Sequence, residues 1–282
     1  MEIIEKAPAK INLGLDIAGK YEDGYHELAM VMTSVDLNDY VTVRELDEDV
    51  IQVSSNNSRM PLNKKNDVYK VARLIKERFA IKQGVAISLE KNIPICAGLG
   101  GGSSDAAATI RALDKLWYLK MTKAEMAEIG FAVGSDVPYC LKGGCALVTG
   151  KGEQVELLPK QPKAWVVLVK PHFGVSTRHI FKEIKVDQIS RVSISKLTQA
   201  ILDDDYEGVI SHMGNSLEDI TIAKRPFIQK IKDRMMASGA DIALMTGSGP
   251  TVFALCRTSK KADRIVNSVR GFCKEVYKVR MI

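Results

Sequence analysis

Pro94-Ile-Cys-Ala-Gly-Leu-Gly-Gly-Gly-Ser-Ser-Asp-Ala-Ala-Ala108 is the most informative part of this chain, because it joins a glycine-rich loop to an alanine-rich helix start. Every residue from Gly98 to Gly102 except Leu99 is glycine, and two serines follow. Glycine lets a backbone adopt positive φ and approach a ligand closely. Serine favours the N-cap, and a helix start presents unpaired amide donors with partial positive charge. The stretch therefore predicts an anion-binding loop with a serine cap, and a plain flexible loop is the alternative.

This loop follows neither common nucleotide-binding pattern. It lacks the lysine of the P-loop GxxxxGK[ST], and its glycines do not match the GxGxxG dinucleotide fingerprint. We therefore expect an anion site of a different design.

The composition is that of an ordinary globular protein. The chain has 282 residues, with 46% hydrophobic and 26% charged side chains, which suffices for two modest domains with their own cores. The net charge of +6 is spread along the chain, so no basic block predicts a nucleic-acid arm. The first residues form no apolar signal segment and no apolar run could cross a membrane, so we expect a cytoplasmic protein.

The cysteines predict no metal or disulfide framework. They stand at positions 96, 140, 145, 256 and 273, form no CxxC pair, and do not cluster with the four histidines. We expect most of them to be buried as small apolar side chains.

Hydrophobic periodicity predicts a mixture of strands and helices. Residues 11–17 alternate apolar and polar side chains, which is the period of a half-buried strand. Asn66 or Asp67 is expected to cap a helix that runs to Phe79, and Thr122-Lys-Ala-Glu125 is a capping box. Further strands are expected at 28–35, 41–44, 51–53, 85–89, 164–169, 242–245, 252–255 and 276–281, and further helices at 194–202, 226–238 and 260–269.

The order of these elements favours an α+β class over a doubly wound sheet, because strands in hairpin-like groups occur among the helices. The polar segment 151–162 contains glycine and proline, so we expect a boundary there that separates residues 1–158 from residues 159–282.

Two pairs of polar residues near the N-terminus are candidates for binding. Lys10 and Asn12 share one face of the first strand, where they could hold a hydroxyl or a phosphate oxygen; a solvated strand face is the alternative. Tyr25 and His26 follow a polar turn and could stack on a flat ring and hydrogen-bond it. Packing at the surface is the alternative for this second pair.

Two later segments carry further candidates. Gly134-Ser-Asp-Val-Pro138 restrains Asp136, which could act as a general base or cap a helix. Thr246-Gly-Ser-Gly-Pro-Thr251 lies between two apolar strands and offers backbone amides to an anion, with a tight turn as the alternative.

Taken together and in this order, these segments resemble the motifs of the GHMP kinase family. Lys6-Ala-Pro-Ala-Lys-Ile-Asn-Leu13 is similar to the first motif, Pro94 to Ala108 to the second, which is the ATP phosphate loop, and Gly247-Ser-Gly-Pro-Thr-Val-Phe253 to the third. The resemblance covers essentially the whole chain. Two positions depart from the pattern: Ala97 stands where glycine is frequent, and Asp105 stands where asparagine occurs.

Three more segments narrow the resemblance to the family member whose acceptor is a cytidine diphosphate-linked methylerythritol. They are Asp23-Gly-Tyr-His-Glu-Leu28, Gly134-Ser-Asp-Val-Pro-Tyr-Cys140 and Lys170-Pro-His-Phe-Gly-Val-Ser-Thr177. The resemblance implies transfer of the ATP γ-phosphoryl group to the C2 hydroxyl of that acceptor, in the non-mevalonate route to isoprenoid precursors. It also implies an N-terminal α+β domain of a ribosomal-protein type and a C-terminal ferredoxin-like domain, with ATP and acceptor meeting between them.

The resemblance further implies roles for individual residues. Asp136 would be the base, and Lys10 would hold Asp136 and the hydroxyl in place. Contacts with ATP are implied for Pro94, Ala97, Gly98, Leu99, Gly100, Gly101, Gly102, Ser103, Ser104, Asn66 and Lys91. Contacts with the acceptor are implied for Asn12, Tyr25, His26, Phe181, Gly247, Ser248 and Gly249. Mg²⁺ would bridge the phosphates, with Ser104 as a candidate ligand and no protein ligand assigned.

Other functions remain open at this point. A GHMP kinase acting on mevalonate-type alcohols or homoserine is one, although such acceptors have no ring for Tyr25, His26 and Phe181 to bind. A non-catalytic nucleotide-binding relative is another, and the presence of both Lys10 and Asp136 argues against it. An RNA-binding module is disfavoured by the scattered charge. We expect small-molecule partners, no nucleic acid or membrane, and a monomer or homodimer.

Overall fold

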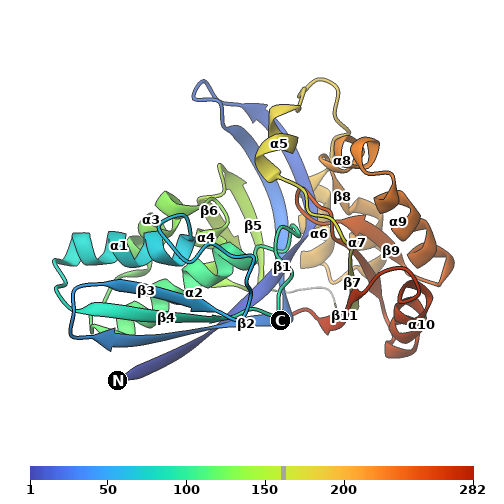
Figure 1. The fold of residues 1–282 in the computed structure, drawn as a ribbon. Coiled ribbons are helices and arrows are strands. Elements are labelled where there is room, and N and C mark those ends of the chain that lie inside the picture. Colours follow the sequence, from blue (N-terminus) through green and yellow to red (C-terminus); the bar gives the residue numbers. More distant parts are fainter. Residues whose placement is uncertain (160–162) are drawn as a thin grey trace. The chain divides into compact units, whose positions relative to one another are not determined.

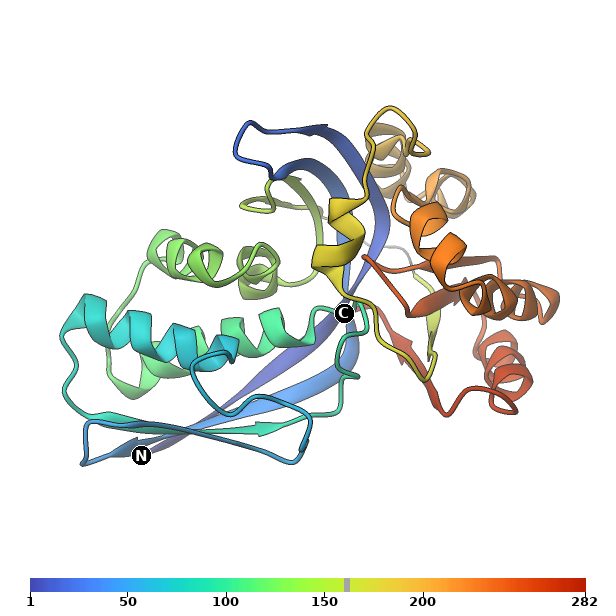
Figure 2. The same ribbon diagram turned by 45° about the horizontal axis from the view of Figure 1, so that its top comes forward.

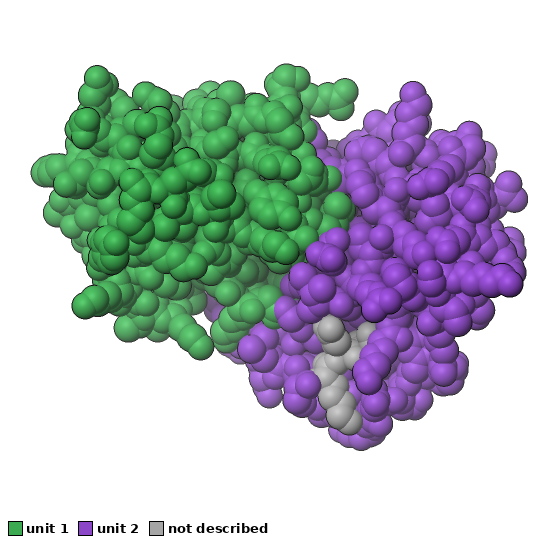
Figure 3. All heavy atoms as spheres, turned by 90° about the horizontal axis from the view of Figure 1, so that it is seen from below, with its two compact units in different colours: residues 1–9, 37–93, 100–143 green, residues 10–36, 94–99, 144–282 purple. Residues whose placement is uncertain are grey.

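The computed structural model describes residues 1–159 and 163–282 (Figures 1 and 2). It contains two compact units, which Figure 3 shows in different colours. Unit 1 comprises residues 1–9, 37–93 and 100–143, and unit 2 comprises residues 10–36, 94–99 and 144–282. The chain thus passes several times between the units, whereas the sequence suggested one boundary after residue 158. That boundary stays a prediction.

Unit 1 consists of a small sheet covered by helices. Strand β3 (Ile51–Ser55) pairs in parallel with β4 (Gly84–Glu90), and β4 pairs antiparallel with Tyr40 to Leu46 of β2 (His26–Leu46). Figures 1 and 2 show α1 (Asp67–Phe79) and α2 (Gly101–Leu116) side by side over these strands. The unit also contains α3 (Lys123–Val133) and α4 (Val137–Lys142). Buried side chains of β4 and α1, such as Ile87 and Val71, form its core.

Unit 2 contains a four-stranded antiparallel sheet of order β11-β7-β10-β9. Its strands are β7 (Trp165–Lys170), β9 (Ile242–Met245), β10 (Val252–Cys256) and β11 (Glu275–Arg280), and α9 (Phe227–Ala237) and α10 (Ser259–Val269) pack on them. When these strands are numbered along the chain, their spatial order is 4-1-3-2, with α9 before the second strand and α10 before the fourth. This is the ferredoxin-like arrangement, so the expected α+β class is confirmed.

The rest of unit 2 surrounds parts of the two long N-terminal strands. Gly14 and Leu15 of β1 (Glu2–Lys20) pair in parallel with β8 (Gly214–Asn215). The first part of β2 pairs antiparallel with β5 (Cys145–Gly150), which in turn pairs with β6 (Gln154–Leu157). The remaining helices are α5 (Thr177–Lys182), α6 (Ile194–Leu202), α7 (Tyr206–His212) and α8 (Glu218–Lys224).

Several local predictions are confirmed. Asn66 caps α1, because its Oδ1 accepts from the amide of Val68 at 3.1 Å. The capping box of α3 is complete: Thr122 Oγ1 accepts from the amide of Glu125 at 3.2 Å, and Glu125 Oε2 accepts from the amide of Thr122 at 2.8 Å. Helix α6 has the bounds expected from its periodicity.

Two expectations about the long strands are wrong. Residues 11–17 are not half-buried, because the polar side chains of Lys10, Asn12 and Asp16 are also buried. The strands expected at 28–35 and 41–44 are one continuous strand, β2. The polar residues between them do not break it, since the carboxylate of Asp39 accepts from the backbone amides of Asn92 at 2.6 Å and Ile93 at 2.8 Å.

No helix within residues 1–159 and 163–282 is long and apolar enough to cross a membrane, and no group of three or more His, Cys, Asp or Glu side chains in these ranges is placed to hold a metal ion. All five cysteines lie in the described ranges as free thiols, of which only Cys96 is exposed. Burial raises the pKa of Cys145 to about 12, so this thiol stays protonated.

Candidate active site

Lys10 and Asn12 form a buried pair on β1 within unit 2. Lys10 Nζ donates to Asn12 Oδ1 at 2.8 Å. The backbone amide of Lys10 donates to the carbonyl of Leu99 at 3.0 Å, so the first motif is joined to the first half of the phosphate loop. Both side chains are buried, so the alternative of a solvated strand face is wrong.

The third motif packs against the same place. Gly98 has φ +78°, and a Cβ there would lie 2.4 Å from the carbonyl oxygen of Thr246, so only glycine fits. At Gly247, which has φ +57°, the Cβ position lies 3.6 Å from Lys10 Nζ. The amide of Thr251 donates to the carbonyl of Ala97 at 3.3 Å. Unit 2 thus brings the first motif, residues 94–99 and the third motif together.

Ser248, in the turn after Gly247, is joined to helix α5. Its Oγ lies 2.8 Å from Oγ1 of Thr177, the first residue of α5. Phe181 follows one turn later on the same helix. The Gly-Ser-Gly turn and Phe181 are therefore parts of one connected structure in unit 2.

His26 and Phe181 lie in contact, edge to face. Their ring centroids are 5.5 Å apart, with an interplanar angle of 63°. His26 is buried, and burial, together with the charge of Lys20, lowers its pKa, so the ring is neutral at physiological pH. Its Nε2 is buried without a hydrogen-bond partner in the described part of the chain. Such an atom is suited to a ligand's polar edge.

Tyr25 is placed differently from its neighbour. Its side chain is 57% exposed, and Lys151 Nζ lies 5.2 Å from its ring centroid. The ring is therefore accessible, as a stacking surface must be, and the neighbouring cation is attracted to its π face.

The second half of the phosphate loop belongs to unit 1. Helix α2 begins at Gly101, and its N-cap is Gly100 with φ +68°, so the expectation of a serine N-cap is wrong. Serine rarely adopts this left-handed conformation. Ser103 and Ser104 lie inside the first turn, and the buried Ser104 Oγ has no partner among the residues that the structure describes. No side chain caps the first turn in that part of the chain, so its amide donors remain available for an anion.

A buried ionic cluster lies beside this helix start. Lys91 Nζ contacts Asp39 Oδ2 and lies 2.5 Å from Asp105 Oδ2, and all three side chains are nearly inaccessible to solvent. Lys91 Nζ is also 3.4 Å from the Cβ position of Gly101. Burial raises the pKa of Asp105 to about 7, with the negative charge of Asp39 adding to the effect. Asp105 Oδ1 has no hydrogen-bond partner within residues 1–159 and 163–282.

The side chains of Asn66 and Lys91, both expected beside the adenosine, are used within unit 1. Asn66 Nδ2 donates to the carbonyl of Pro61 at 2.8 Å, while its Oδ1 caps α1. Lys91 is held by its two carboxylates. Their contacts with the nucleotide stay a prediction.

Asp136 occupies the N-cap position of α4 in unit 1. Its side chain makes no capping hydrogen bond to that helix within the described residues, so the alternative of a helix-capping carboxylate is not observed. The Cβ position of Gly134, two residues earlier, lies 3.8 Å from Ser103 Oγ. Unit 1 thus brings the loop that carries Asp136 to the start of α2.

Three residues that hold these segments were not singled out from the sequence. Thr246 and Asn215 contact the first and third motifs, and Asp39 completes the ionic cluster. Thr246 directly precedes the Gly-Ser-Gly turn, which is the only local signal. Asn215 and Asp39 act through partners 30 or more residues away, so no local pattern marks them.

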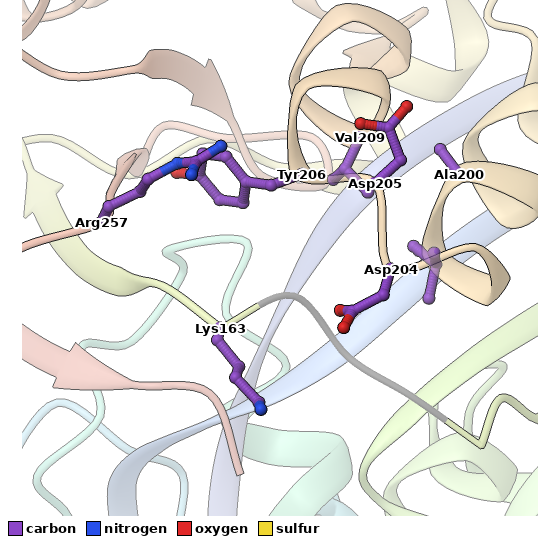
Figure 4. A pocket seen from close by; sticks show the side chains of 8 residues that line it. Lys163, Ala200, Asp204, Asp205, Tyr206, Val209 and Arg257 are labelled. Carbon is purple, nitrogen blue, oxygen red and sulfur yellow. The ribbon is translucent and has the colours of Figure 1, made fainter.

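A separate pocket of about 210 Å³ lies between α6, α7 and the end of β10 in unit 2 (Figure 4). Arg257 stacks 4.3 Å from the ring centroid of Tyr206, whose hydroxyl lies 2.9 Å from Asp241 Oδ2. None of the predicted site residues lines it.

Comparison with known proteins finds relatives that match the whole length of this chain. The family models for the GHMP kinases N terminal domain and the GHMP kinases C terminal domain match residues 66–144 and 197–275. A curated protein of Streptococcus mutans named "Putative 4-diphosphocytidyl-2-C-methyl-D-erythritol kinase" is 68% identical over 282 residues, which is 100% of both chains. A protein of Streptococcus uberis with the same name is 64% identical, again over 100% of both chains.

Solved structures show the same fold. A crystal structure of 4-(cytidine 5'-diphospho)-2C-methyl-D-erythritol kinase matches with a TM-score of 0.82 and 29% identity, covering 100% of this chain and 99% of the other. Homoserine kinase from Cytophaga hutchinsonii matches with a TM-score of 0.79 and 23% identity over 100% of this chain and 95% of its own, a likeness of fold alone. The chain belongs to the GHMP kinase family.

Proposed function

We propose that this protein is a 4-diphosphocytidyl-2-C-methyl-D-erythritol kinase, which transfers the γ-phosphoryl group of ATP to the C2 hydroxyl of its cytidine-bearing acceptor. The observation that carries the proposal is the ring site of Tyr25, His26 and Phe181, supported by relatives 64–68% identical over the full length. A kinase for mevalonate or homoserine would have no use for such a site.

The ring site fits a cytosine. His26 is a neutral imidazole with a buried, unpartnered Nε2 in the described chain, so a ligand's polar edge would satisfy it. Phe181 holds the His26 ring by its edge contact, and the exposed ring of Tyr25 offers a face for stacking. Together these side chains would bind one flat, polar-edged ring.

ATP is the phosphoryl donor of GHMP kinases, and we assign its phosphates to the loop from Pro94 to Ser104. The bare first turn of α2 would direct amide donors and partial positive charge at them. Contacts with the phosphates are assigned to Pro94, Ala97, Gly98 and Leu99 and to the residues from Gly100 to Ser104. Asn66 and Lys91 would act at the adenosine side by holding α1 and α2 in place.

A magnesium ion suits this site. The buried Ser104 Oγ lacks a partner in the described chain and is a hard oxygen donor at the start of α2, so Ser104 would contribute to holding the ion. Bound there with ATP, Mg²⁺ would neutralise phosphate charge.

Asp136 would take the proton of the acceptor hydroxyl, as the family resemblance implies. Lys10, held by Asn12, would orient the hydroxyl and offset the negative charge that develops on it. Asn12 would reach the erythritol end, and Gly247, Ser248 and Gly249 would lie along the acceptor. We further propose that residues 1–158 and 159–282 are the two functional domains of a cytoplasmic monomer or homodimer.

The test is a coupled ADP-release assay on the purified protein with three alcohols: the cytidine-bearing methylerythritol, mevalonate and homoserine. We expect MgATP-dependent turnover with the first alone. Turnover with mevalonate or homoserine and none with the first would refute the proposal.

A further inference from the structure

Thr246 is buried where the three motifs meet in unit 2. Its Oγ1 accepts from the backbone amide of Asn12 at 3.1 Å. The same oxygen lies 3.4 Å from Asn12 Oδ1 and 3.4 Å from the carbonyl oxygen of Gly98, to either of which its proton can be donated. One hydroxyl therefore contacts the first motif and the phosphate loop, and its residue directly precedes the third motif.

We infer that Thr246 is a positioning residue for phosphoryl transfer, an inference that rests on the proposed function. Its hydroxyl fixes Asn12, whose Oδ1 accepts from Lys10 Nζ at 2.8 Å. The Thr246 hydroxyl also contacts the carbonyl of Gly98. It therefore holds the Lys10 ammonium and the Gly98 end of the phosphate loop in a fixed relative position.

The backbone on both sides of Thr246 is held still. Asn215 Nδ2 donates to the carbonyls of Met245 at 2.7 Å and Gly247 at 2.8 Å, and Asn215 Oδ1 accepts from the amide of Leu217 at 2.9 Å. The amide of Thr246 donates to the carbonyl of Thr251 at 3.0 Å. These hydrogen bonds fix the backbone that carries the Thr246 hydroxyl. The hydroxyl can therefore define the position of Asn12.

Loss of the hydroxyl would leave the buried amide of Asn12 without a hydrogen-bond partner. We expect β1 and the turn at Thr246 to move apart, because an unpaired buried amide is unfavourable. A displacement of about 1 Å in a phosphoryl-transfer site can cost roughly a hundredfold in rate. Since Thr246 itself would touch neither substrate, the loss should fall on kcat more than on KM.

The experiment compares Thr246→Val, which keeps the shape and removes the hydroxyl, with Thr246→Ser, which restores it. Thr198→Val is the matched control, because Thr198 lies on α6 of the same unit, outside the assigned site, and its buried Oγ1 has no partner in the described chain. Steady-state kcat and KM for ATP and acceptor are measured, with the melting temperature of each variant.

We expect Thr246→Val to lower kcat about tenfold to a hundredfold with both KM values changed less than about threefold. Thr246→Ser should recover most of the loss, and Thr198→Val should retain wild-type kcat. Equal kcat for Thr246→Val and Thr198→Val, or no recovery with serine, would overturn the inference while leaving the proposed function intact. A wild-type protein that releases ADP with none of the three alcohols would end both.

Discussion

Units 1 and 2 each contain candidate site residues, and the two units hold these residues by different interactions. In unit 2, neutral hydrogen bonds join segments that are over 200 residues apart in the chain, as between Asn12 and Thr246. In unit 1, the start of α2 lies beside a buried lysine between two carboxylates. The difference indicates that pH will act on the ionic cluster of unit 1, whereas in unit 2 neutral hydroxyl and amide groups hold the Lys10 ammonium in place.

The largest stability effect is expected from Lys91→Met. This change keeps the apolar stem but leaves Asp39 and Asp105 buried together without a cation. Breaking a buried ion pair from one side typically costs about 3–5 kcal/mol of the free energy of unfolding. Urea unfolding of the purified variant measures it.

Lys70→Met is the matched control, because the Lys70–Asp67 pair in the same unit has a 2.7 Å contact but is more than a third exposed. We expect a loss of about 0–1 kcal/mol there. Similar losses for the two variants would show that the cluster does not support unit 1.

A smaller, pH-dependent effect is expected from Asp105→Asn. The pKa of Asp105 is raised from 3.8 to about 7 in the folded protein, so between these values the folded state binds the extra proton and wild-type stability falls as pH rises. Asparagine mimics the protonated carboxyl and removes this dependence.

Melting temperatures from pH 4 to 8 provide the measurement. The stability of the variant relative to wild type should rise by roughly 1–3 kcal/mol up to about pH 7 and then level off. A constant difference across this range would mean that Asp105 is ionised throughout.

The smallest effect is expected in the ring site of unit 2. Tyr25→Ala should raise the acceptor KM about tenfold through lost stacking, with kcat and the KM for ATP nearly unchanged. Tyr21→Ala is its control, since the Tyr21 ring lies 5.1 Å from the same Lys151 Nζ but is not assigned to the acceptor. Equal acceptor KM values for the two variants would remove Tyr25 from the site.

Local features of the fold could be predicted from sequence because their physics is local. The capping box at Thr122 and Glu125 and the periodicity of α6 involve neighbours in the chain, and both were found. The burial of Lys10 and Asn12 could not be found this way, because it depends on segments near residues 98 and 246. The predicted serine cap is wrong because the N-cap position has a left-handed conformation, which Gly100 adopts and serine rarely does.

The candidate site shows the same limit. Its motifs could be recognised in order, yet their supports could not: Asp39 lies in the middle of a strand, and Asn215 in a two-residue strand that pairs with β1. Both act through side-chain bonds to distant backbone or charge, which leave no periodic signal.

The central proposal is that Asp136 and Lys10 act together on the acceptor hydroxyl. A double-mutant cycle of kcat with Asp136→Asn, Lys10→Met and both together tests it most directly. We expect Asp136→Asn to lower kcat by about 10²–10⁴ while ATP still binds, and the double variant to be no slower than the slower single variant. Losses that multiply in the double variant, or near-normal turnover of Asp136→Asn, would contradict the claim.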